Sequence, residues 1–134
     1  MKAVFADTVY FLALLNAGDQ LHGQARELSH HPPGPLITTE FVLAEVGDAL
    51  SRGENRLRFA RLVEILRRQA DADIVPATSR LFRQACELHA RRPDKEWSLT
   101  DCSSFVVMKE SSLQSALTSD HHFEQAGFRL LMSA

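Results

Sequence analysis

Short apolar runs alternate with longer segments of helical periodicity along the whole chain. The apolar runs cover residues 2–6, 36–39, 72–77, 115–119 and 128–132, and each has the length of a buried β-strand. Helical patterns cover residues 8–16, 19–31, 40–52, 54–70, 78–92, 98–111 and 120–127. Strands that alternate with helices predict an α/β fold, in which a mainly parallel sheet is covered by helices on both faces.

The longest helical pattern, ENRLRFARLVEILRRQA at residues 54–70, is amphipathic. Its apolar positions recur at spacings of three and four residues, which predicts that one face of the helix packs against the rest of the protein. The residues expected on this inward face are Leu57, Ala60, Leu62, Ile65 and Leu66.

Three aspartates are predicted to lie at one edge of the sheet. Asp7 directly follows the first strand, Asp120 begins the helix after the fourth strand, and Asp101 lies in the first turn of the helix that Ser98 opens. In a parallel sheet the covering helices begin at the edge where the strands end, and ligands bind at that edge. The aspartates are therefore candidates for a shared site.

Helix capping is the alternative explanation for each aspartate. Asp7 and Asp120 stand where an N-cap residue belongs, and Asp101 follows Ser98 by three residues, as in a capping box. Taken one at a time, capping accounts for these residues as well as a functional role does. Their predicted position at one edge is what favours a common function.

Glu45 gives a more specific signal than the aspartates. It lies four residues after Phe41 and three after Val42, so it falls on the apolar stripe of its helix, where we expect it to be buried. A buried carboxylate needs a partner. Asp48 is expected at the surface, and the position of Glu40 at the helix start is explained by the helix dipole.

Four carboxylates close together repel one another, and a divalent cation would relieve that repulsion. Carboxylate oxygens suit Mg²⁺ or Mn²⁺ better than zinc. His121 and His122 follow Asp120 directly and point about 100° apart on a helix, so they lack the i, i+4 spacing of a zinc-binding histidine pair. In this stretch we expect Asp120 to act as the ligand and Phe123 to pack into the core.

Composition predicts one globular domain over residues 1–134, with 45% apolar and 24% charged residues. The apolar start of the chain is interrupted by Asp7 and lacks a signal-peptidase pattern, and no run is long enough to span a membrane, so we expect a cytoplasmic protein. The net charge of −2 argues against a protein that coats nucleic acid. Ten of the fifteen basic residues are nevertheless arginines between Arg52 and Arg92, which form either a solvated helix face or a phosphate-contacting surface.

Four segments of the chain resemble the sequence blocks of PIN-domain proteins, as in VapC-type toxins and related stand-alone PIN nucleases. The segments are FADTVYFLALL, TTEFVLAEVGDAL, SLTDCSSFVVM and ALTSDHHFEQAGF, and the resemblance extends over nearly the whole chain. It implies a three-layer α/β/α sandwich with strand order 3-2-1-4-5. The implied acidic quartet is Asp7, Glu45, Asp101 and Asp120, with Thr8 and Thr118 or Ser119 as polar neighbours.

The resemblance also implies a function: a metal-dependent endoribonuclease that uses Mg²⁺ or Mn²⁺, with RNA as substrate, a homodimeric assembly and an antitoxin protein as partner. Arg58, Arg61 and Arg68 are the candidates for RNA contacts. The chain departs from the family pattern at His122, where many relatives carry a further aspartate. The resemblance therefore implies a first metal ion but does not extend to a second, tightly held one. The alternative function is a non-catalytic PIN-scaffold module that binds RNA or a protein. Phosphotransfer through Asp7 is disfavoured because the chain lacks the Asp-x-Asp that haloacid-dehalogenase-like proteins carry after the first strand.

Overall fold

The computed structural model describes residues 2–134 and contains a five-stranded parallel sheet. The strands are β1 (Val4–Ala6), β2 (Leu36–Thr39), β3 (Ala72–Val75), β4 (Ser115–Leu117) and β5 (Arg129–Leu130). Their order is β3-β2-β1-β4-β5, and every neighbouring pair is parallel. The predicted fold class and strand order are confirmed, although β1, β3, β4 and β5 are shorter than the apolar runs that predicted them.

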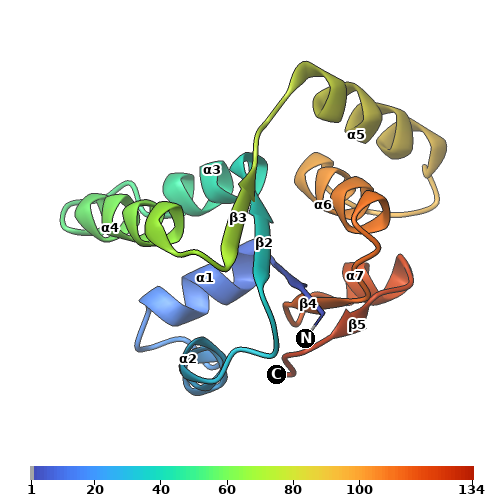
Figure 1. Ribbon diagram of the computed structural model, residues 1–134. Helices are drawn as coiled ribbons and strands as arrows, with labels where there is room; N and C mark the ends of the chain where they lie inside the picture. The colour runs from blue at the N-terminus through green and yellow to red at the C-terminus, as the bar shows by residue number, and fades with distance from the viewer. Residues whose placement is uncertain (1) are drawn as a thin grey trace.

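Seven helices connect and cover the strands within the described residues. They are α1 (Thr8–Leu15), α2 (His22–His30), α3 (Glu40–Ala49), α4 (Asn55–Arg68), α5 (Ser79–Arg91), α6 (Leu99–Glu110) and α7 (His121–Gln125). In Figure 1, α1, α3 and α4 lie on one side of the strands, whereas α5, α6 and α7 lie on the other. The sheet is therefore the middle layer of an α/β/α sandwich.

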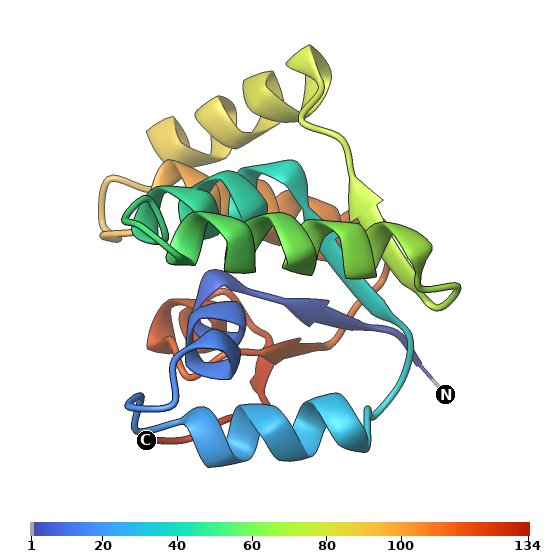
Figure 2. The ribbon, with the colours of Figure 1, turned by 90° about the vertical axis from the view of Figure 1, so that its left-hand side faces the viewer.

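The C-terminal segment lies along α2, as the view in Figure 2 shows. The side-chain amide of Gln24 donates a hydrogen bond to the backbone oxygen of Ser133 at 2.6 Å. The backbone N–H of Ser133 donates to Oε1 of Gln24 at 3.1 Å. This pair of bonds fixes the end of the chain against the helix that follows α1.

A cluster of aromatic side chains packs α6 and α7 against the sheet. Phe105 of α6 makes edge-to-face contacts with both Trp97 and Phe123, in each case with ring centroids 4.9 Å apart. Phe123 also contacts Phe5 of β1, with a centroid distance of 6.2 Å. Phe5 precedes Asp7 by two residues, Phe105 lies one turn after Asp101, and Phe123 lies in the first turn after Asp120. Packing of this cluster thus fixes the three segments that carry the aspartates.

The inward face of α4 is narrower than the sequence predicts. Leu62 and Leu66 are buried, but Leu57 and Ile65 are 55% and 60% exposed, and Ala60 is exposed as well. The prediction for these last three residues is wrong. Helix α4 lies at the outside of the molecule and packs mainly on α3 and β3, so only a narrow stripe of its surface is covered.

Candidate active site

The loops and helix starts at the carboxyl ends of β1 and β4 bring Asp7, Asp101 and Asp120 together. Asp7 follows the last residue of β1, and Asp120 lies three residues after β4. Asp101 is in the first turn of α6. The charges of Asp101 and Asp120 both raise the pKa of Asp7, and the charge of Asp120 also raises the pKa of Asp101, which places the three carboxylates in one electrostatic cluster. We call these three residues, together with Glu45, the acidic edge.

Asp7 occupies the N-cap position of α1, but its side chain makes no capping hydrogen bond. Its Oδ2 instead accepts a hydrogen bond from the hydroxyl of Thr118 at 2.8 Å, and the residue is only 4% exposed. The pKa of Asp7 is raised to about 7, chiefly by burial and also by the neighbouring carboxylates. Hydrogen bonds from Thr118 and from the Thr8 backbone lower the pKa but do not cancel the effect of burial. The capping explanation fails for this residue.

Asp101 both caps its helix and faces the cluster. Ser98 and Asp101 form the predicted capping box, in which the Ser98 N–H donates to Oδ2 of Asp101 at 3.1 Å. The same Oδ2 lies 3.2 Å from Nδ1 of His122. Burial raises the pKa of Asp101, and the charge of Asp120 adds to that effect. For Asp101, helix capping and a place in the acidic cluster are both true.

Asp120 also has two roles, and Thr118 connects it to Asp7. Its Oδ1 accepts the backbone N–H of His122 at 2.9 Å and so caps α7. The Asp120 N–H donates to the hydroxyl of Thr118 at 3.0 Å, and that hydroxyl in turn donates to Asp7. One threonine hydroxyl therefore connects the carboxylate of Asp7 to the backbone of Asp120. Ser119, the other predicted polar neighbour, lies between Thr118 and Asp120 in the chain and is half-buried.

Glu45 reaches the acidic edge by a different route from the one predicted. The residue is exposed, so the prediction that it is buried on the apolar stripe of α3 is wrong. Its Oε1 accepts a hydrogen bond from the hydroxyl of Thr8 at 2.5 Å, and Thr8 is the residue directly after Asp7. The apolar residues beside Glu45 on α3, Val42 and Val46, are fully buried, whereas Glu45 itself is exposed. Asp48 is exposed, as predicted.

The chemistry of these donors fits a hard divalent cation. Within the described residues, the acidic edge offers carboxylate oxygens from three buried or half-buried aspartates and from one exposed glutamate. The raised pKa values of Asp7 and Asp101 report that burial disfavours their charged forms. A bound Mg²⁺ or Mn²⁺ would counter that cost and keep the carboxylates ionised. Asp7, Asp101, Asp120 and Glu45 are the carboxylates that would hold it, and among residues 2–134 the donor atoms of Asp120, His121 and His122 lie within 4.8 Å of one another.

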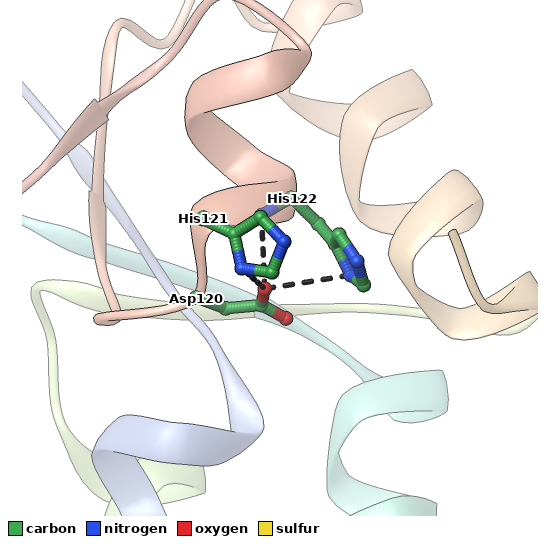
Figure 3. A group of neighbouring side chains, drawn as sticks. All are labelled: Asp120, His121 and His122. Atoms are coloured by element: carbon green, nitrogen blue, oxygen red, sulfur yellow. Dashed lines mark hydrogen bonds and ion pairs between the residues drawn. The ribbon is translucent and has the colours of Figure 1, made fainter. Parts of the chain in front are cut away.

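His122 is the residue whose position the sequence did not predict. In Figure 3 its ring lies to one side of the Asp120 carboxylate and is joined to it by a dashed line. Nδ1 lies 3.4 Å from Oδ1 of Asp120 and 3.2 Å from Oδ2 of Asp101. The His121 ring also leans toward Asp120, at 3.9 Å from Oδ1, but its side chain is 70% exposed. Phe123 is buried as predicted. The only sequence feature that could have pointed to the position of His122 is its departure from the family pattern, in which many relatives carry an aspartate.

The candidate RNA-binding arginines lie away from the acidic edge. Arg58 and Arg61 line a mostly apolar cavity of about 390 Å³ between α1, α2 and α4, which also contacts the residues that begin β1 and β2. Arg58 donates a hydrogen bond to the backbone oxygen of Leu15 at 3.2 Å. Arg68 forms an ion pair with Glu64 at 2.6 Å, on the same exposed helix face. The structure does not join these arginines to the carboxylates in one site.

The fold is a three-layer α/β/α domain with an acidic edge, and the chain belongs to the PIN-domain family, whose model matches residues 4–129. The chain is similar to the 23S rRNA-specific endonuclease VapC20 of Mycobacterium tuberculosis. The two are 34% identical over 125 residues, which cover 93% of this chain and 95% of VapC20. The crystal structure of VapC20, described as a sarcin–ricin loop cleaving toxin, matches with a TM-score of 0.85 at 32% identity, over 96% of this chain and 98% of that one.

More distant solved structures share the fold. FitAcB from Neisseria gonorrhoeae has a TM-score of 0.66 at 16% identity and covers 95% of both chains. VapBC2 from Rickettsia felis, bound to a DNA fragment from its promoter, has a TM-score of 0.60 at 12% identity over 96% of this chain and 97% of that one. Over the described residues, every helix is too short or too polar to cross a bilayer.

Proposed function

We propose that this protein is a metal-dependent endoribonuclease of the VapC type, the toxin of a toxin–antitoxin pair. The observation that carries the proposal is the acidic edge, where buried Asp7 shares one hydrogen-bonded network with Asp120 through Thr118. A buried carboxylate with a pKa near 7 is costly to ionise unless a cation accompanies it. The identity of 34% with VapC20, a 23S rRNA-specific endonuclease, supports RNA as the substrate.

In this proposal each polar side chain at the edge has a positioning role. Thr118 holds Oδ2 of Asp7, and Thr8 orients the carboxylate of Glu45. The capping contacts of Asp101 fall on Oδ2, and the backbone bond to Asp120 falls on Oδ1, so each carboxylate has a fixed orientation. When bound, Mg²⁺ or Mn²⁺ supplies a Lewis acid that lowers the pKa of an attacking water and stabilises charge on the phosphate. Hydrolysis of this kind leaves 5′-phosphate and 3′-hydroxyl ends.

The substrate and partners follow from the similarity to VapC20. A structured RNA loop, with the sarcin–ricin loop of 23S rRNA as the first candidate, is the proposed substrate. A toxin that attacks the cell's own RNA needs a neutralising partner, so we infer that an antitoxin protein binds this chain. We also infer a homodimer and a cytoplasmic location, where both the RNA and the antitoxin are made.

Cleavage of RNA by the purified protein tests the proposal. A sarcin–ricin loop hairpin is incubated with Mg²⁺, with Mn²⁺ or with EDTA, and a DNA hairpin of the same sequence serves as the control. We expect metal-dependent cuts in the RNA alone, with 5′-phosphate ends. Binding of the RNA without cleavage under any metal condition would instead identify a non-catalytic PIN module.

A further inference from the structure

Among residues 2–134, His122 is the one nitrogen-bearing side chain that contacts two carboxylates of the acidic edge. Its Nδ1 lies 3.2 Å from Oδ2 of Asp101 and 3.4 Å from Oδ1 of Asp120. Neighbouring ligands of one six-coordinate ion lie about 3 Å apart when each is about 2.1 Å from the metal. His122 is thus placed beside an ion that binds to either aspartate.

The ring of His122 is held in this position by the surrounding structure. Its side chain is 21% exposed, compared with 70% for the neighbouring His121. The backbone N–H of His122 donates to Asp120, and the next residue, Phe123, is fully buried against Phe5 and Phe105. The donor atom is therefore positioned before any ion arrives, as an effective ligand must be.

We propose that His122 supplies a nitrogen ligand to the divalent cation of the acidic edge, and that this ligand makes the site selective for Mn²⁺ over Mg²⁺. Oxygen donors alone suit both ions, whereas imidazole nitrogen is a ligand for transition metals and a poor one for Mg²⁺. This inference rests on the proposed function, because it assumes that the carboxylates hold a cation. It specifies which cation and which additional side chain.

Pulsed electron paramagnetic resonance of bound Mn²⁺ tests the ligand directly. A coordinated imidazole gives a ¹⁴N coupling, which changes to the ¹⁵N pattern when the protein is made with ¹⁵N-histidine. We expect this coupling in the parent protein and in His121→Ala, and we expect it to be absent in His122→Ala and His122→Asp. A histidine coupling that is absent from the parent, or that persists in both His122 variants, overturns the proposal.

Calorimetric titration with Mn²⁺ and with Mg²⁺ tests the selectivity. The ratio of the two dissociation constants should shift toward Mg²⁺ by about tenfold or more in His122→Asp, which replaces the nitrogen donor with an oxygen donor. His121→Ala should keep the parent ratio. An unchanged ratio in His122→Asp would mean that the ring only tethers the two carboxylates by hydrogen bonds.

The two readouts separate failure of this inference from failure of the proposed function. If Mn²⁺ binds the parent protein and Asp101→Asn removes that binding, the cation site exists whatever the role of His122. In that case a missing histidine coupling refutes only the nitrogen ligand. If neither ion binds the parent protein, the metal dependence on which the proposed function stands is refuted as well.

Discussion

The acidic edge and helix α4 are both charged regions, but they differ in how their charges relate to the core. At the acidic edge, Asp7 is buried and hydrogen-bonded, and its position depends on packing of the aromatic cluster beneath it. On α4, the arginines are exposed and two large apolar side chains, Leu57 and Ile65, are exposed beside them. A buried charge is costly, so its presence in a folded protein indicates a ligand or a partner. An exposed charge costs little, so it gives only weak evidence for a ligand.

The largest expected effect concerns the carboxylates of the acidic edge. Asp101→Asn and Asp120→Asn should each reduce RNA cleavage by about a hundredfold or more, because the loss of a metal ligand removes several kcal/mol of transition-state stabilisation. The amide still caps the helix, so folding should be retained. Glu45→Gln should lose activity too, and its exposure means that folding is not at risk. Cleavage rates and thermal melts of the variants measure both effects.

Asp48→Asn is the matched control for these substitutions. It removes the same charge from an exposed position on the helix that carries Glu45. We expect its cleavage rate to stay within about twofold of the parent. Equal losses in Asp48→Asn and Asp101→Asn would show that net charge, and not the acidic edge, controls activity.

The second prediction concerns pH in the absence of metal. The pKa of Asp7 is raised to about 7 in the folded protein from an ordinary value of 3.8, so the folded state keeps a proton that the unfolded state loses. The stabilisation is fully present below about pH 4 and is lost as the pH rises through about 7. The difference is on the order of 4 kcal/mol. Urea unfolding in EDTA at pH 5 and pH 8 captures the part of this difference that falls between the two values, about 2.7 kcal/mol, and Asp7→Asn should show a smaller difference than the parent.

The third prediction concerns the cation itself. Mn²⁺ or Mg²⁺ at about a hundred times its dissociation constant should stabilise the parent protein by about 2.7 kcal/mol, because it binds the folded state only. This corresponds to a rise of several degrees in the melting temperature. Asp101→Asn should lose most of that rise. A melting temperature that is independent of both ions, with no heat of binding, would contradict a metal site.

The smallest effect is expected from α4. Replacing Arg58, Arg61 and Arg68 with Glu should weaken RNA binding and flatten its salt dependence, if these side chains contact phosphates. Because they lie away from the carboxylates, the cleavage rate of saturated enzyme should change little. Binding measured at two salt concentrations tests this prediction. If affinity and salt slope are both unchanged, the arginines form a solvated helix face.

The sequence predicted the position of the aspartates because chain topology alone determines it. Asp7 follows a strand, Asp120 follows another, and any parallel sheet of this kind brings such positions to one edge. Capping and metal binding could not be separated from the sequence, since both place an acidic residue at a helix start. The structure separates them for Asp7, which makes no capping bond.

The errors arose where the answer depends on how one element packs on another. Periodicity identified an apolar stripe on α4 but could not show that, of its five predicted inward residues, only Leu62 and Leu66 are buried. It also placed Glu45 on the apolar stripe of α3, although the residue is exposed and pairs with Thr8. The contact between His122 and Asp101 depends on the angle between α6 and α7, which the packing of Phe105 on Phe123 determines.

Asp7→Asn offers the most direct measurement, because it changes stability and activity in opposite directions. The free energy of unfolding of Asp7→Asn and of the parent is first measured without metal at pH 8. Cleavage of the RNA hairpin by the same preparations is then measured with Mn²⁺. We expect Asp7→Asn to be more stable than the parent, because a buried charge is removed, and to lose cleavage by about a hundredfold or more. Cleavage at the parent rate by a folded Asp7→Asn protein would contradict this expectation.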